Sequence, residues 1–344
     1  MLFLSIFGGF IGLLFVYLVV FIFFPVLKVK APSFEGELGD VPAAPSYRKN
    51  VEYTSMGVTI RSWLYVPEKT DGPYPCVILC NGFGGTKDII LEQYAKRFAD
   101  EGIASIALEY RHYGESDGQP RQFYSSTGQL EDIQASVQFA RSLKEIDSSK
   151  ILIWGTSAGG GYGINIAADD HEICGVISQC SAWDHKKDDK LIMKREGIGF
   201  MFRLIAHAQR DKGRSRFNLS PHTIPLLGEP YSTSMLNAPG GLKGYAGIVH
   251  KNSLFKNEIC PRIMLMKQAD QAVNRIVDVT CPVLLLVCEN DELIAPGSHE
   301  IAVERLGDRV QLHTYPIGHF DIYKGEHFEK AVGVMIEFIK RVIQ

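Results

Sequence analysis

Ser157 stands in a pattern that is typical of a catalytic nucleophile. It lies at the centre of the pentapeptide GTSAG (155–159), directly after the apolar run KILIW (150–154) and before a stretch compatible with a helix. Small residues on both sides of a serine let the backbone turn sharply from a strand into a helix and leave the hydroxyl exposed. The amide after the serine and the start of the helix then face a developing oxyanion. The spacing therefore predicts a nucleophile elbow at Ser157.

An acid and a base follow later in the chain. Asp291 comes after the apolar run 282–288, and His319 comes after the run 309–315. Ligands of open α/β sheets bind just past the carboxyl ends of the strands, where both residues would lie. Histidine titrates in the range that a general base needs, and a carboxylate can hold its imidazole in the required tautomer. Ser157, Asp291 and His319 are therefore our candidates for nucleophile, acid and base.

Three other carboxylates could take the place of the predicted acid, namely Asp184, Glu289 and Asp321. An isolated loop aspartate is also commonly a turn residue or a helix N-cap, and an isolated histidine is commonly a hydrogen-bonded surface group. The chain order serine, acid, histidine, with each residue after its own strand, favours the catalytic interpretation over these ordinary roles.

A glycine-rich segment supplies candidates for an oxyanion hole. The run CVILC (76–80) leads into NGFGG (81–85), and glycines allow backbone amides to approach an oxygen closely. We expect the N–H groups of Phe83 and Ala158 to be the two donors. A simple tight turn is the alternative, whereas a phosphate-binding loop is disfavoured because NGFGGTKD lacks the G-K-[ST] ending.

Short apolar runs alternate with amphipathic stretches over most of the chain. The strands and helices that this alternation predicts would position the candidate site residues. Continuous apolar strands that alternate with helices indicate a mostly parallel sheet covered on both faces, which is an α/β fold. The expected strands are 58–66, 76–80, 103–109, 150–154, 173–178, 282–288 and 309–315, and the expected helices are 88–101, 129–144, 157–169, 297–306 and 326–342.

The interval of about 183–276 lacks this regular succession of strands and helices, which predicts a helical cap insertion. Its first part, residues 185–216, carries ten Lys and Arg against four Asp and Glu, a local net charge of about +6. Such a run is commonly a solvated helical face. The alternative is an electropositive lid that meets anionic lipid head groups or an acidic substrate.

The N-terminus differs in composition from the rest. Residues 2–27 carry no charge and are almost wholly apolar, which predicts a transmembrane helix, with residues 1–30 forming the anchor and its basic flank. A cleaved signal peptide is the alternative. Lys28 and Lys30 follow the apolar run, so the positive-inside bias predicts a single-pass membrane protein whose catalytic domain faces the cytoplasm. The composition of residues 31–47 predicts a linker, and residues 48–344 form the α/β domain with its cap.

Charge and cysteine usage exclude several classes of protein. The net charge of −3 argues against a dedicated nucleic-acid binder. The seven cysteines show no close-spaced metal pattern, and we expect them to be reduced packing residues. We therefore expect no nucleic-acid partner, no metal and no cofactor. The sequence does not determine the oligomeric state.

Five segments together resemble the α/β-hydrolase superfamily, and more narrowly its dienelactone-hydrolase-like and serine-aminopeptidase-like members. The resemblance covers about residues 48–344, and its motifs are NGFGGTKD, EYRHYGESDGQPRQF, IWGTSAGGGYG, CENDELIAP and YPIGHFDIYKGEHFE. It implies an eight-stranded, mostly parallel sheet with helices on both faces. The chain departs from the family at Asn81, where the family usually has histidine in the loop that shapes the oxyanion hole.

The resemblance also implies roles for individual residues. Ser157 would be the nucleophile, Asp291 the acid and His319 the base, with the amides of Phe83 and Ala158 as oxyanion donors. We therefore predict a membrane-anchored serine hydrolase that cleaves a carboxylic ester or thioester of a lipophilic small molecule through an acyl-enzyme. A peptidase or amidase, an acyltransferase using the same triad and a non-catalytic binding module are the alternatives. Residues that bind the substrate are not identifiable from the sequence.

Overall fold

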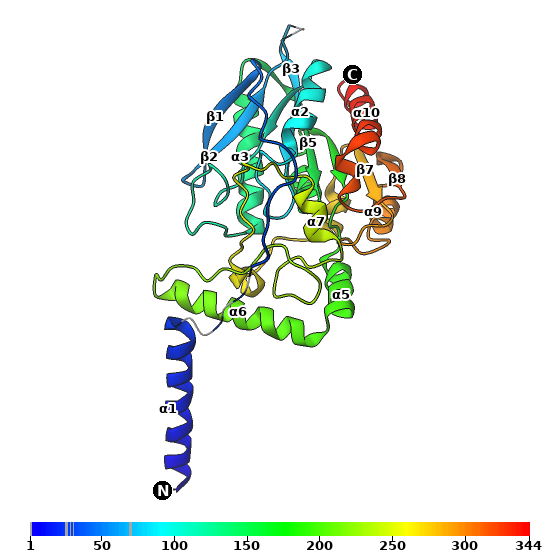
Figure 1. Cartoon of the computed structure of the whole chain (residues 1–344). Coiled ribbons are helices and arrows are strands. Elements are labelled where there is room, and N and C mark those ends of the chain that lie inside the picture. The colour runs from blue at the N-terminus through cyan, green and yellow to red at the C-terminus, as the bar shows by residue number, and fades with distance from the viewer. Residues whose placement is uncertain (1, 25–26, 28, 30, 69–70) are drawn as a thin grey trace.

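The computed structural model describes residues 2–24, 27, 29, 31–68 and 71–344, with the side chains of the first helix described from Gly8 onward. Lys28 and Lys30, the predicted basic flank, lie outside the described residues. The main body is a twisted sheet with helices on both faces, and a group of helices below it carries the first helix of the chain (Figure 1).

One sheet of eight strands forms the centre of the body, in the order β1-β2-β4-β3-β5-β6-β7-β8. β1 and β2 pair antiparallel at one edge, β2 pairs antiparallel with β4, and the strands from β4 to β8 run parallel. This architecture confirms the predicted α/β-hydrolase fold with its mostly parallel sheet. The strands are β1 (Arg48–Ser55), β2 (Val58–Tyr65), β3 (Tyr74–Cys80), β4 (Ala104–Ala107), β5 (Ile146–Thr156), β6 (Ile173–Gln179), β7 (Val283–Cys288) and β8 (Val310–Tyr315).

Helices cover both faces of this sheet. α2 and α10 contact each other on one face, and α3 and α4 contact each other on the other (Figure 1). The helices are α1 (Leu2–Phe23), α2 (Leu91–Asp100), α3 (Ser126–Ser142), α4 (Ala158–Asp169), α5 (His185–Glu196), α6 (Ile198–Arg216), α7 (Gly241–Ala246), α8 (Ala272–Arg275), α9 (Glu300–Leu306) and α10 (Gly325–Val342).

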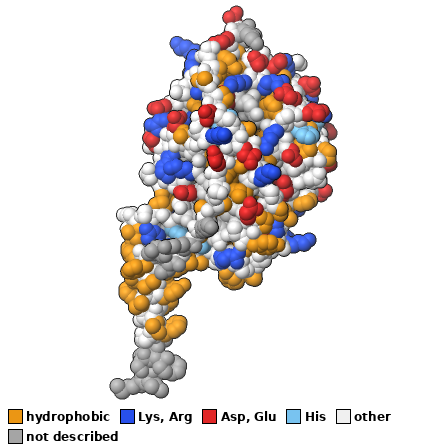
Figure 2. All heavy atoms as spheres, in the orientation of Figure 1, with side chains coloured by type: hydrophobic (Ala, Val, Ile, Leu, Met, Phe, Trp, Pro, Cys, Tyr) orange, Lys and Arg blue, Asp and Glu red, His pale blue; other side chains and the backbone are white. Residues whose placement is uncertain are grey.

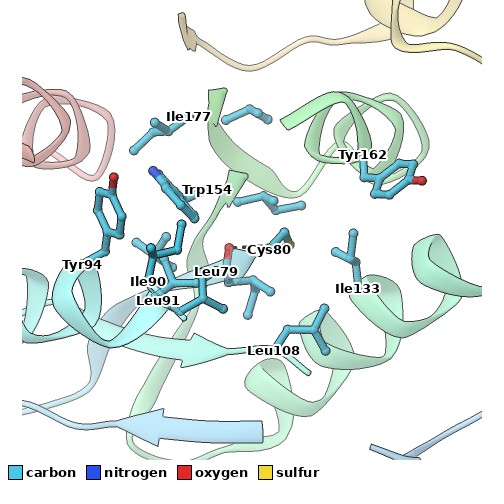
Figure 3. Close-up of a cluster of buried hydrophobic side chains, with 14 of the residues drawn as sticks. Leu79, Cys80, Ile90, Leu91, Tyr94, Leu108, Ile133, Trp154, Tyr162 and Ile177 are labelled. Carbon is cyan, nitrogen blue, oxygen red and sulfur yellow. Dashed lines mark hydrogen bonds between the residues drawn. The ribbon is translucent and has the colours of Figure 1, made fainter. Parts of the chain in front are cut away.

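The central strands contain continuous apolar runs, and both of their faces are covered by helices. Every residue of β3 from Cys76 to Cys80 is fully buried. Figure 3 shows Leu79 and Trp154 of neighbouring strands between Tyr94 of α2 on one side and Ile133 of α3 on the other. Burial on both faces explains why these strands read as continuous apolar runs rather than as an alternating pattern.

The interval that breaks the alternation lies between β6 and β7 and contains α5 to α8. We refer to residues 180–282 as the cap segment. α6 packs against a short 3-10 helix, Pro261–Leu265, and the buried carboxylate of Asp211 on α6 accepts a hydrogen bond of 2.7 Å from Arg262 in that helix. The division of the chain into anchor, linker and hydrolytic domain stays a prediction.

The predicted transmembrane helix is wrong. Within the residues that the structure describes, no helix is long and apolar enough to cross a membrane. The predicted single-pass localisation and the membrane partner are corrected with it.

The end of α1 is held by the cap segment. The guanidinium of Arg210 on α6 donates to the carbonyl of Phe21, and Arg214 donates to the carbonyl of Ile22 at 2.9 Å. The rings of Phe23 and Phe217 lie 5.2 Å apart. Figure 2 shows hydrophobic side chains gathered on α1 and on the cap segment beside it, whereas charges of both signs are mixed over the body. Two of the basic residues in 185–216 therefore form hydrogen bonds within the protein.

Candidate active site

The turn from β5 into α4 holds Ser157 in a strained conformation. Its backbone angles are φ 52° and ψ −122°, which residues with a side chain rarely adopt. A Cβ on Gly155 would lie 2.2 Å from the carbonyl oxygen of Gly159, so the two ends of the turn approach closely only because residue 155 is glycine. This is the geometry that the GTSAG pattern predicts for a nucleophile elbow.

His319 and Asp291 form a buried hydrogen-bonded pair. The Nδ1 atom of His319 lies 2.6 Å from Oδ2 of Asp291, and the two side chains are 3% and 6% exposed. The other carboxylate oxygen of Asp291 accepts hydrogen bonds from the amides of Leu293 and Ile294. The amide of His319 donates to Oε2 of Glu292 at 3.0 Å. Backbone and side-chain contacts therefore fix the orientation of both partners.

Two features of the surroundings of His319 have opposite effects on its pKa. Burial by itself lowers the pKa of the imidazole, but the negative charge of Asp291 and the hydrogen bond to it raise the pKa, with a smaller contribution from Glu292. The net result is a pKa above the ordinary value of 6.5. This environment favours the imidazolium, which is the form that a general base produces when it accepts a proton.

Three of the five predicted site residues line one small cavity. Ser157, His319 and Phe83 all line a cavity of about 30 Å³. Ala158 begins α4 directly after the serine, and a Cβ on Gly82 would lie 3.1 Å from the Cβ of Ser157. The structure thus places all five predicted site residues at the carboxyl ends of β3, β5, β7 and β8 or in the segments that follow them.

The other candidate acids have different partners. Asp184 is the N-cap of α5 and accepts hydrogen bonds from the amides of Lys186 and Lys187. Asp321 accepts a hydrogen bond from the amide of Gly318. Glu289 is exposed. Of the candidate carboxylates, that of Asp291 contacts the imidazole of His319.

Asn81, the departure from the family pattern, braces the loop that follows β3. Its Oδ1 accepts from the amide of Gly82, and its Nδ2 donates to the carbonyl of Thr86, both at 2.8 Å. A Cβ on Gly85 would lie within 2.6 Å of this side chain, so the loop closes around it. The side-chain amide of Asn81 therefore gives the loop after β3 a fixed shape without a histidine.

Below this loop lies a buried charge cluster that the sequence did not reveal. Lys87 is 1% exposed, and its ammonium contacts Glu109 at 2.7 Å and Glu115 at 2.6 Å. The Glu109 carboxylate, with no exposed surface, also accepts from the amides of Lys87 and Glu115. Burial raises the pKa of Glu109, and the nearby Lys87 opposes this rise. The sequence signal was a lysine two residues after the glycine-rich segment 81–85.

A second buried carboxylate joins the cap segment to the loop of Asp291. Asp188 on α5 accepts a hydrogen bond of 2.8 Å from the amide of Ala295, four residues after Asp291. Burial raises the pKa of Asp188 from 3.8 to about 6. The folded protein therefore disfavours the charged form of Asp188 relative to water, although a carboxyl with this pKa is still mainly ionised at neutral pH.

Comparisons with known proteins identify the family. A family model described as serine aminopeptidase, S33, matches residues 71–216. The quorum-quenching protein AidA of Acinetobacter baumannii is 34% identical over 306 residues, which cover 89% of this chain and 98% of that protein. The chain belongs to the α/β-hydrolase superfamily. It is a hydrolase of this superfamily.

Other α/β-hydrolase relatives agree with the fold. A thiohydrolase of Eupenicillium brefeldianum is 23% identical, with 85% of this chain and 94% of that protein covered. The crystal structure of the α/β hydrolase GrgF from Penicillium sp. sh18 superimposes with a TM-score of 0.69 at 23% identity, covering 86% of this chain and 98% of that one. At this identity the structural likeness shows the fold alone.

We predict that Lys87→Met destabilises the protein by about 3–5 kcal/mol, because it leaves the carboxylate of Glu109 buried without its cation. Urea unfolding would measure the difference. Lys330→Met is the matched control, because Lys330 pairs with Glu326 on the exposed face of α10 and such pairs contribute about 0.5 kcal/mol. Equal effects of the two substitutions would contradict the proposed importance of the buried cluster.

We predict that Asp188→Asn stabilises the protein at neutral pH and that the gain vanishes in acid. Asparagine keeps an acceptor for the amide of Ala295 but carries no buried charge. Because the folded pKa of about 6 lies above the ordinary 3.8, the wild type loses stability relative to the variant as pH rises from about 4 to 6. Two pKa units correspond to about 3 kcal/mol, the upper limit of the gain.

Urea unfolding at pH 4.5 and pH 7.5 would measure this difference. Asp308→Asn, at an exposed position after α9, serves as the control and should show no such pH-dependent gain. A stability difference between wild type and Asp188→Asn that stays constant with pH would contradict the prediction.

Proposed function

We propose that the protein is a serine hydrolase that cleaves a carboxylic ester or thioester of a small molecule through an acyl-enzyme. The observation that carries the proposal is the buried hydrogen bond of 2.6 Å between His319 and Asp291, next to the cavity that Ser157 also lines. A hydroxyl becomes an effective nucleophile only when a base removes its proton, and His319 can supply that base.

In the proposed mechanism, His319 accepts the proton of the Ser157 hydroxyl as the oxygen attacks the carbonyl carbon of the substrate. The negative charge that forms on the carbonyl oxygen accepts hydrogen bonds from the amides of Phe83 and Ala158. Asp291 stabilises the imidazolium. His319 then protonates the leaving alcohol or thiol, and a water molecule, activated by the same histidine, releases the carboxylic acid and regenerates Ser157.

The relatives and the cap segment favour an ester or thioester over a peptide. One relative is named a thiohydrolase, and the alcohol of an ester or the thiol of a thioester leaves more readily than the amine of a peptide. An aminopeptidase would need carboxylates that bind the free α-amino group of its substrate, whereas residues 185–216 carry ten basic against four acidic residues. An acyltransferase would use the same acyl-enzyme and differ only in the acceptor, an alcohol or amine in place of water.

Labelling with a fluorophosphonate probe tests the nucleophile. We expect the wild type to be labelled and Ser157→Ala not to be, because the probe phosphonylates an activated serine hydroxyl. Circular dichroism would show that the variant is folded. A folded wild-type protein that the probe does not label would contradict the proposed catalytic role of Ser157.

Substitution of Asp291 tests whether its carboxylate is the catalytic partner of His319. Asp291→Asn should lower the turnover of an activated ester by about 10³–10⁴-fold, because an amide cannot stabilise the imidazolium and favours the wrong tautomer. Asp184→Asn should leave turnover nearly unchanged, since asparagine also serves as an N-cap. The reverse result would show that the acid is misassigned. Product analysis with an added alcohol or amine would distinguish a hydrolase from a transferase.

A further inference from the structure

The catalytic cavity is too small for a substrate. Its volume of about 30 Å³ has room for about two water molecules, whereas sites for small organic ligands measure roughly 300–1,000 Å³. An acyl group bound to Ser157 therefore needs space beyond this cavity. The question is where the structure provides that space.

A second cavity of about 420 Å³ lies directly beside the first. It is bounded by the start of α2, by the segment Tyr323–Phe328 that leads into α10, by residues 247–250 after α7 and by residues 38–42 of the predicted linker. Most of its lining surface is apolar, and its volume falls within the range of small-ligand sites.

Three side chains separate the two cavities. Ile90, Ile248 and Tyr323 line both of them. The hydroxyl of Tyr323 is held by Thr156 at 2.5 Å, next to the nucleophile, so this ring is fixed. The side chains of Ile90 and Ile248 are apolar and make no hydrogen bond, and the two residues are 4% and 5% exposed. Rotation of these two aliphatic side chains would join the cavities.

The carboxylates in the lining are neutralised or bonded elsewhere. Asp88 accepts hydrogen bonds from Thr86, Ser253 and the amide of Leu254. Glu92 is paired with Arg48 and with Lys96. Because these acids already have partners, they do not require a cation from a ligand.

The N-terminal segment closes the outer side of this cavity. The amide of Glu37 donates to the carbonyl of Ala246, and that of Leu38 donates to Val249, at 2.9 and 3.1 Å. A Cβ on Gly36 would lie 2.4 Å from the carbonyl oxygen of Val249, so this close approach requires glycine. The segment that we predicted to be a linker therefore forms one wall of the second cavity, and Val41 is one of its lining residues.

We propose that the second cavity binds the acyl chain of the substrate, which passes from Ser157 between Ile90 and Ile248 and ends near Val41. This inference rests on the proposed function and adds to it the substrate class, an unbranched aliphatic acyl group of medium length. Each methylene buried in the cavity should contribute up to about fourfold to kcat/KM.

The test compares p-nitrophenyl acetate with p-nitrophenyl decanoate. In the wild type, kcat/KM should be higher for decanoate. Val41→Trp adds an indole to the lining of the second cavity, so it should lower kcat/KM for decanoate at least tenfold and change that for acetate less than twofold, because Val41 does not line the cavity of Ser157. Val277→Trp, the same substitution at an exposed position outside the cavity, should change neither.

Ile248→Ala removes part of the wall between the cavities and should raise the ratio of kcat/KM for decanoate to that for acetate. If Val41→Trp lowers both esters equally, or if neither variant changes the ratio, the proposed acyl site is wrong. Labelling of each variant by a small fluorophosphonate shows that the catalytic centre is folded. A wild-type protein that hydrolyses neither ester and is not labelled would contradict the proposed function itself, which is a distinguishable result.

Discussion

The close approach of β5 and α4 at Ser157 is the constraint on which the site depends. The backbone turns through a conformation with φ 52° at the serine, and the carbonyl of Gly159 occupies the space that a Cβ of residue 155 would need. On the other side, a Cβ on Gly159 would lie 2.5 Å from the carbonyl oxygen of Asn81, so the loop after β3 packs onto the same turn. Because Gly155 and Gly159 have no side chains, the end of β5, the start of α4 and the loop after β3 can meet at the hydroxyl of Ser157.

Buried charges hold the surrounding loops in place, and each is costly unless it has partners. Lys87 and Glu109 pair beneath the loop after β3, and Asp291 and His319 pair after β7 and β8. Asp188 joins the cap segment to the loop of Asp291 through a single backbone amide. Removal of one partner leaves an unpaired charge in a region of low polarity, so these contacts link the stability of the fold to the geometry of the site.

Much of the fold could be predicted because its central strands are buried on both faces. The runs 76–80 and 150–154 fall within β3 and β5, and the helix expected over 326–342 is α10. β1 was missed because it is an edge strand whose residues from Arg48 to Glu52 are half-buried or exposed, which leaves no apolar pattern. The transmembrane helix was predicted from apolar composition alone, and the described part of the chain contains no helix that could span a membrane.

By itself, the sequence determined the class of fold and the order of the candidate residues, because strand periodicity and the GTSAG turn are local properties of the chain. Only the tertiary structure decided which carboxylate meets the imidazole, since Asp184, Asp291 and Asp321 all follow apolar strands and differ in where their loops fold. It also decided that residues 36–42 form the wall of a cavity, because this depends on hydrogen bonds to residues more than 200 positions away. Contacts between distant segments have no signature in the local pattern of residues.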